Sequence, residues 1–230
     1  MRFEFLIPEN LDLASLQSSL QENNRVRLDS ERTVYRTFYD SFDWRLYCDN
    51  SLLEDSRDGK GHTLSRRTLK GASGETRLQL KKVPRFAREL PRGRFRDLLE
   101  PVLEMRELLP KVRIRSRIKT LRVLNRDDKT VAWLVLEKNT LPKQQGTRSM
   151  KLGERAIIIP VKGYRKPCRQ ITGLLEELGL TAANDDLMHV ALSSIGLTPC
   201  NYSTKLDLIL DPAMRTDQAG KLILHRLLDI

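Results

Sequence analysis

The sharpest pattern along the chain is the strict alternation of residues 111–119, which read KVRIRSRIK. Successive side chains of a β-strand point to opposite faces, so this pattern predicts a strand with one cationic face and one mainly apolar face. The cationic face carries Arg113, Arg115, Arg117 and Lys119. Neighbouring cations in such a row lie about 6.5–7 Å apart, a spacing that suits the repeating charges of a phosphate chain. The competing interpretation is a basic strand face that contacts only solvent.

Weaker alternation recurs along the chain and predicts a sheet of short strands. Strands are expected near residues 2–7, 33–40, 52–57, 62–70, 76–82, 111–124, 130–137 and 156–161. Apolar residues at helical spacing predict helices near residues 13–20, 94–105, 167–178, 187–195 and 216–228. We therefore expect an α+β fold, an eight-stranded antiparallel β-barrel (tunnel) with short flanking helices. In such a tunnel, we expect Arg113, Arg115 and Arg117 to point inward.

The composition adds a strong positive charge to this picture. The 230 residues contain 41 lysines and arginines against 30 aspartates and glutamates, a formal net charge of +11. This excess favours polyanionic partners such as phosphorylated polymers, nucleic acid or an anionic membrane surface, without choosing among them. No run of about 18 apolar residues occurs, so no membrane span is expected. The three cysteines are far apart and show no CxxC or metal-finger spacing, which favours a reducing cytoplasm.

Several short strings follow one another in an order that points to a known family. They are TFYDS at residues 37–41, DWRL at 43–46, TLKG at 68–71, the arginine-rich strand at 110–117, LVLE at 134–137 and a helix ending in glycine-leucine at 174–180. This order resembles the CYTH domain, the triphosphate tunnel metalloenzyme family, over residues 1–200. Residues 201–230 resemble the linker and first helix of a CHAD domain, a helical module often fused after CYTH.

The resemblance implies an eight-stranded tunnel whose basic residues bind a triphosphate and whose clustered glutamates hold Mg²⁺ or Mn²⁺. The cations that match the family pattern are Arg66, Lys70, Arg77, Arg113, Arg115, Arg117 and Lys119. Two weaker binding candidates are Arg36 and Lys162, for which a surface role is an equal explanation. The acids at plausible metal-binding positions are Glu4 and Glu137, although Glu4 is equally well explained as the ion-pair partner of an arginine.

The acidic part of the family pattern is depleted in this chain. The family begins with glutamate-x-glutamate-x-lysine, whereas here Glu4 stands between Arg2 and Leu6. The late strand of the family alternates two glutamates, and this chain has isoleucines and a proline at residues 157–160. Hard divalent cations need several oxygen ligands, so Mg²⁺ or Mn²⁺ is expected to bind only weakly. The expected function is binding of inorganic polyphosphate, tripolyphosphate or another triphosphate, with weak or no hydrolysis.

Two other functions stay open at this point. One is an active Mg²⁺- or Mn²⁺-dependent inorganic triphosphatase. The other is a basic nucleic-acid-binding module, which is not expected because aromatic residues make up only 6% of the chain and do not interleave with residues 111–119. The amphipathic segment at 216–228 is expected to dock loosely on the barrel, or to pair with a CHAD domain or with a second copy of the chain.

Overall fold

A computed structural model of the protein describes residues 3–23, 25–58, 61–69, 75–142, 149–201 and 210–228. Its strands form one sheet in the order β5-β4-β3-β2-β6-β7-β8-β1-β9. These strands are β1 (Phe3–Ile7), β2 (Arg25–Asp40), β3 (Ser51–Arg57), β4 (His62–Thr68), β5 (Thr76–Leu80), β6 (Leu109–Leu124), β7 (Thr130–Leu141), β8 (Met150–Pro160) and β9 (Thr181–Ala182). The helices are α1 (Leu13–Asn23), α2 (Arg45–Cys48), η1 (Ala87–Glu89), α3 (Arg94–Leu103), α4 (Arg165–Glu177), α5 (Leu187–Ser194) and α6 (Thr216–Leu228).

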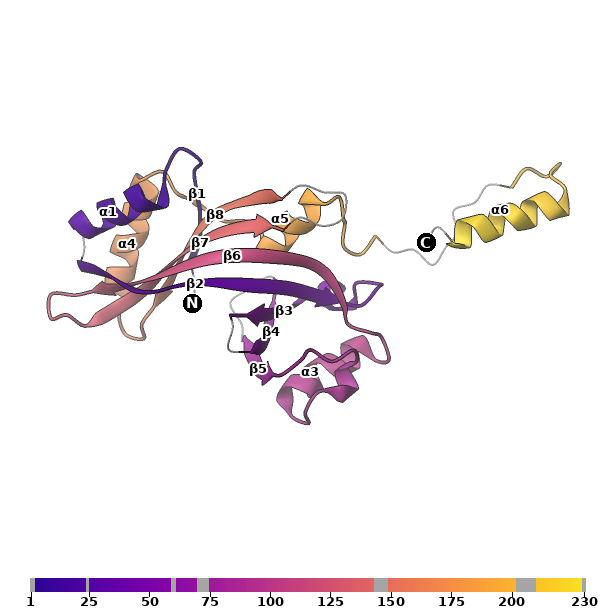
Figure 1. The fold of residues 1–230 in the computed structure, drawn as a ribbon, viewed down its shortest axis with the longest axis horizontal. Coiled ribbons are helices and arrows are strands. Elements are labelled where there is room, and N and C mark those ends of the chain that lie inside the picture. Colours follow the sequence, from indigo (N-terminus) through magenta and orange to yellow (C-terminus); the bar gives the residue numbers. More distant parts are fainter. Residues whose placement is uncertain are drawn as a thin grey trace.

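The predicted α+β class is confirmed, and the curved sheet has the form of an incompletely closed tunnel. All pairings between neighbouring strands are antiparallel. The long strands β2 and β6 run side by side through the middle of the molecule (Figure 1). The sheet has nine strands instead of the expected eight, because the two-residue β9 adds to the edge beside β1.

Helices cover the convex, outer face of the sheet at two separate places. Under α1 and α4, buried side chains of the helices pack on β6 and β7, with Leu16 and Leu175 against Leu121 and Leu134. Under α3, a second cluster covers the outer face of β3, β4 and β5. Between these two covered areas, the outer face of β2 and β6 carries mainly polar and charged residues.

The end of α4 shows how local sequence sets these layers. Gly179 has a positive φ of 85°, a conformation that costs glycine little. Its N–H donates to Glu176, and the N–H of Leu180 donates to the carbonyl of Leu175. This is the Schellman pattern that closes helix C-termini. It turns the chain back toward the sheet, where Leu180 is buried.

On the concave, inner face, α5 closes one end of the tunnel. Its residues Leu187, Met188, Ala191 and Leu192 pack against Phe38, Leu52 and Ile114 in a third apolar cluster. Deeper in this face, the hydroxyl of Ser116 donates a 2.6 Å hydrogen bond to Asn139, and both side chains are buried. The inner face therefore changes from apolar beside α5 to polar in its middle.

The spacing of the cysteines does not predict the disulfide bond that joins Cys48 to Cys200. It ties the segment after α5 to the end of α2, while Cys168 is a buried free thiol. None of the helices in the described ranges is long and apolar enough to cross a membrane.

Candidate functional site

The inner face of the sheet encloses a cavity of about 220 Å³. Its walls come from β1 to β8 and from the first residue of α5. Among the residues that the structure describes, ten charged side chains line it, namely Glu4, Arg32, Arg36, Glu54, Asp58, Arg67, Glu75, Arg77, Glu137 and Arg155. Five are arginines and five are carboxylates, so the described part of the lining is formally neutral although the whole chain carries +11. Opposite charges are therefore held together in this cavity.

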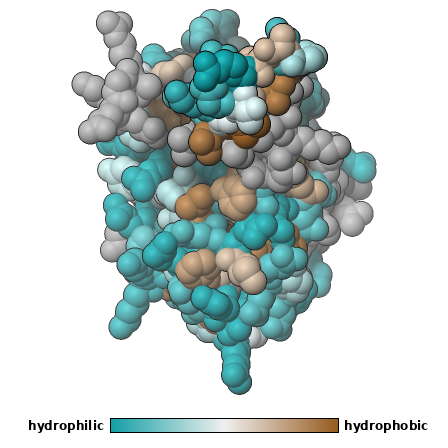
Figure 2. All heavy atoms as spheres, turned by 90° about the vertical axis from the view of Figure 1, so that its right-hand side faces the viewer, coloured by the Kyte–Doolittle hydropathy of each residue, from teal (hydrophilic) through white to brown (hydrophobic). Residues whose placement is uncertain are grey.

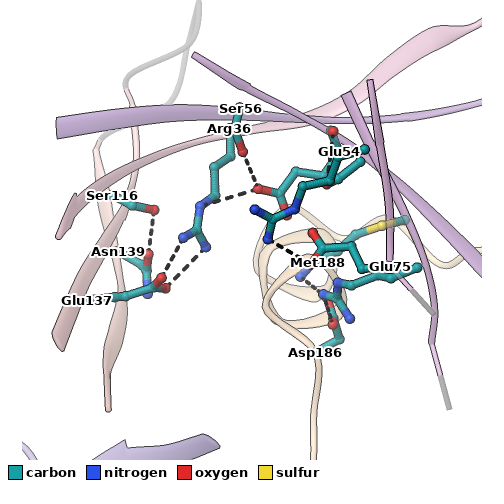
Figure 3. A network of polar contacts seen from close by, with 12 residues as sticks. Arg36, Glu54, Ser56, Glu75, Ser116, Glu137, Asn139, Asp186 and Met188 are labelled. Carbon is teal, nitrogen blue, oxygen red and sulfur yellow. Dashed lines mark hydrogen bonds and ion pairs between the residues drawn. The ribbon is translucent and has the colours of Figure 1, made fainter. Parts of the chain in front are cut away.

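Arg36 lies at the centre of this arrangement (Figure 3). Its Nη1 and Nη2 donate to the two carboxylate oxygens of Glu137 at 3.1 and 2.5 Å, and its Nε lies 3.5 Å from Glu54. Burial by itself lowers the pKa of Arg36, but the charges of Glu137 and Glu54 outweigh it and leave that pKa raised. Arg36 is thus a permanent cation that two glutamates hold in a fixed position.

Two further arginines are paired inside the cavity. Arg155 is 1% exposed, and its Nη1 lies 3.4 Å from Oε2 of Glu4. Arg67 donates to Asp186, whose other oxygen caps α5 by accepting from the N–H of Met188. Burial lowers the pKa of Arg67, and the charge and hydrogen bond of Asp186 raise it by more. The Arg67 pair therefore joins β4 to the helix that closes the tunnel.

The last two arginines stand near the mouth of the cavity and are more exposed. Arg77 lies 2.7 Å from Glu75, and the hydrogen bond from that carboxylate raises the pKa of Arg77. Arg32 lies 3.7 Å from Asp58. The side chains of these two arginines are 65% and 55% exposed. Exposed pairs of this kind contribute little free energy, so an incoming anion can replace their carboxylates easily.

The structure brings together four of the predicted site residues and separates the others from them. The four residues in the cavity lining are Glu4, Arg36, Arg77 and Glu137. Arg66 is on the opposite face of β4, where it donates to Ser51, and Lys162 is exposed after β8. Lys70 lies outside the described residues.

The expected inward orientation of Arg113, Arg115 and Arg117 is wrong. The inward-facing Val34 and Arg36 of β2 pair directly with Ser116 and Ile114 of β6, so the arginines between them point to the outer face. Lys119 shares that outer face. The reason is the other side of the strand: Val112, Ile114 and Ile118 are buried, and burial of an apolar set fixes the register and facing of a strand.

Sequence reasoning missed three arginines of the cavity, which are Arg32, Arg67 and Arg155. Arg66, which the family resemblance named, is the direct neighbour of Arg67, and a shift of one residue in a strand reverses the face. Arg155 lies directly before the apolar run at 156–159, which gave no sign that a buried cation precedes it. The one indication of Arg155 is Glu137, the acid that lies directly opposite it on β7.

The glutamates at the predicted metal positions do not fit a divalent cation as they lie. Both oxygens of Glu137 accept from Arg36, and Glu4 faces Arg155. No three carboxylate, imidazole or thiol groups converge as a metal site anywhere in the described ranges. Mg²⁺ and Mn²⁺ require several oxygen ligands, and here arginines occupy those oxygens.

Comparison with known proteins finds similarity of fold. No family model and no curated protein sequence matches the chain. A candidate adenylate cyclase of Bacillus halodurans superposes with a TM-score of 0.56 at 10% identity, covering 80% of this chain and 92% of that one. The chain has a CYTH-like fold.

Two further solved structures agree with this fold. A candidate adenylyl cyclase of Hippeastrum, described as having a dominant triphosphatase activity, also gives 0.56 at 13% identity, covering 88% of this chain and 99% of that one. A candidate adenylate cyclase of Vibrio parahaemolyticus gives 0.50 at 9% identity, with 83% and 95% covered. Identities this low concern the fold alone.

Proposed function

We propose that the inner cavity binds inorganic tripolyphosphate or a short inorganic polyphosphate, with weak or no hydrolysis. The observation that carries this proposal is the convergence of five arginines from β2, β4, β5 and β8 on one cavity. Guanidinium groups bind phosphate oxygens in pairs, and they keep their charge at every physiological pH. The cavity volume of about 220 Å³ is below the range of about 300–1,000 Å³ for drug-sized ligands, which favours a compact anion.

Binding in this cavity requires an exchange of partners. Phosphate oxygens take the places of carboxylate oxygens, first at the exposed Arg77 and Arg32 and then at the buried Arg36. The five carboxylates compete for the same guanidinium groups, so affinity is lower than in a tunnel lined by cations alone. The carboxylate of Glu137 is the strongest competitor, because it holds Arg36 by two hydrogen bonds.

The same pairs support weak hydrolysis. Phosphoryl transfer depends on charge stabilisation at the leaving oxygens and on a positioned nucleophile. In this cavity Glu137 and Glu4 face arginines, which leaves them poorly placed to orient water or a metal ion. A second candidate function is a metal-dependent triphosphatase. It is favoured by three glutamates, Glu4, Glu54 and Glu137, that line one cavity in a fold shared with the Hippeastrum protein.

Calorimetric titration with tripolyphosphate, with and without Mn²⁺, tests the proposal together with Glu137→Gln. This change removes the competing charge from Arg36 and keeps a side chain of the same shape. We expect affinity to rise by about tenfold, since one charge-assisted contact no longer has to be broken. Arg36→Gln should lower affinity by about tenfold or more, and Arg92→Gln, at an exposed position outside the cavity and before α3, is the control of equal charge.

The phosphate released in the same samples separates the two functions. Rapid Mn²⁺-dependent release that is lost in Glu137→Gln would establish the triphosphatase and exclude our proposal. No binding of tripolyphosphate by the wild-type protein at low salt would exclude both. Near-ultraviolet circular dichroism of each variant shows whether the fold is kept, because removing one member of a buried pair lowers stability.

Two further proposals concern the C-terminal segment and the cellular location of the protein. We assign residues 201–230 to the linker and opening helix of a CHAD-like helical module, supported by the amphipathic pattern of α6. We also propose a cytoplasmic location, where Cys48 and Cys200 would be thiols, because disulfides rarely persist in a reducing compartment.

A further inference from the structure

The outer face of the sheet has an uncovered basic strip between the helices described above. We define it as Arg113, Arg115 and Arg117 of β6, Tyr35 of β2 and Arg57 of β3. Sheet pairing places Tyr35 directly between Arg115 on one neighbouring strand and Arg57 on the other. The strip therefore runs both along β6 and across three adjacent strands.

The cations of this strip differ from those of the cavity, because the described part of the chain pairs no carboxylate with them. The structure shows no carboxylate paired with Arg113, Arg115 or Arg117 among the residues that it describes. Arg113 and Arg117 are exposed. Three like charges at about 6.5–7 Å intervals repel one another unless an anion lies along them. The arrangement is therefore complementary to a chain of regularly spaced negative charges.

An aromatic ring belongs to the same surface. Tyr35 is 47% exposed, and the guanidinium of Arg57 lies 5.7 Å from its ring centroid. The sequence alone argues against nucleic acid because no aromatic residue stands within 111–119. The pairing of β2 with β6 supplies one from 80 positions away, as the direct neighbour of Arg115. Cations and an aromatic ring thus interleave in space although they do not in sequence.

We propose that the basic strip binds single-stranded nucleic acid. The arginines of β6 contact successive phosphates, and Tyr35 with Arg57 provides a surface on which a base stacks. The strip is on the face opposite the tripolyphosphate cavity, so this inference does not depend on the function proposed for that cavity.

The ring distinguishes this partner from other polyanions. Inorganic polyphosphate offers no base, so Tyr35 would be irrelevant to it. A duplex keeps its bases stacked inside and presents only phosphates to a sheet face. A membrane surface would call for apolar anchors, and the neighbours of Tyr35 on this face of β2 are Thr33 and Thr37.

Fluorescence anisotropy with a labelled single-stranded oligouridine tests the proposal on the whole chain. Arg113→Gln/Arg117→Gln should weaken binding by about tenfold or more and lower the slope of log affinity against log salt by about 1.4, for two lost phosphate contacts. Tyr35→Ala should weaken binding by about tenfold, whereas Tyr35→Phe keeps the ring and should bind nearly as well. Arg92→Gln/Arg94→Gln removes equal charge from exposed positions by α3 and should change binding little.

Each contrary result has a definite meaning. No binding of the oligonucleotide at low salt overturns the proposal. Equal losses in the Arg92/Arg94 variant would show that only net charge matters. If unlabelled inorganic polyphosphate or duplex competes as strongly as the single strand, and Tyr35→Ala binds like the wild type, the strip recognises phosphates alone and the assignment to single-stranded nucleic acid is wrong.

Discussion

Asp40 is 1% exposed and directs the turn from β2 into α2. Its two carboxylate oxygens accept from the backbone N–H groups of Ser41, Leu46 and Tyr47. Burial raises the pKa of Asp40 by more than these hydrogen bonds lower it. The folded protein therefore holds a proton on this carboxyl more tightly than the unfolded chain does.

This raised pKa predicts a pH dependence of stability that Asp40→Asn removes. Between the ordinary value of 3.8 and the raised value, the folded state binds more protons than the unfolded state. The stability contributed by Asp40 is complete below that window and declines as pH rises through it. Urea unfolding of both proteins from about pH 3.5 to about pH 7 measures the difference in unfolding free energy. A difference that stays constant over this range would contradict the expectation.

The arginines show what sequence reveals at the scale of single residues. The family resemblance and the strand alternation named Arg36 and Arg77 among the candidates, and both line the cavity. They did not settle which side of its strand an arginine faces. For β6, the apolar positions Ile114 and Ile118 carried the decisive information, since the hydrophobic side of a strand is the one that the fold buries. The residues beside Arg155 give no such indication. Ala156, Ile157 and Ile158 alternate between the two faces of β8, and all three are buried.

At the scale of elements, strong periodicity made most strands and helices predictable. The helix predicted near 94–105 is α3, with Phe95, Leu99 and Leu103 buried on one side. The sequence does not predict that β2 begins at Arg25, because residues 25–32 are largely polar. The strand forms there by pairing with β6, whose residues are far away in sequence. The same limitation hid the disulfide, because residues 48 and 200 meet only after the sheet has formed.

The disulfide between Cys48 and Cys200 should contribute measurably to stability. It spans 152 positions, and constraining so long a loop removes much conformational entropy from the unfolded chain. We expect reduction to lower the unfolding free energy by about 2–5 kcal/mol, and Cys48→Ser/Cys200→Ser to do the same. Guanidinium unfolding of each protein with and without reductant measures this effect. The double variant should not respond further to reductant, and equal midpoints for oxidised and reduced wild type would contradict the prediction.

At the scale of the whole molecule, α6 lies apart from the sheet (Figure 1). Figure 2 views the molecule from that side and shows hydrophobic side chains scattered among hydrophilic ones. Two leucines of α6 are prominent on its surface, with Leu222 at 42% and Leu224 at 61% exposure. A helix of 13 residues is marginal in water unless its apolar side is covered.

We therefore expect the backbone amides of α6 to exchange rapidly in a dilute monomer and more slowly as protein concentration rises. The slowing follows because a second copy covers Leu222 and Leu224 and stabilises the helix by mass action. Hydrogen exchange followed by mass spectrometry at two concentrations measures this. Leu222→Glu/Leu224→Glu should abolish the dependence on concentration, whereas Lys221→Glu changes a neighbouring exposed residue and should preserve it. Strong protection of α6 in the dilute monomer would show that the helix is stable without a partner, and the expectation of pairing would then be wrong.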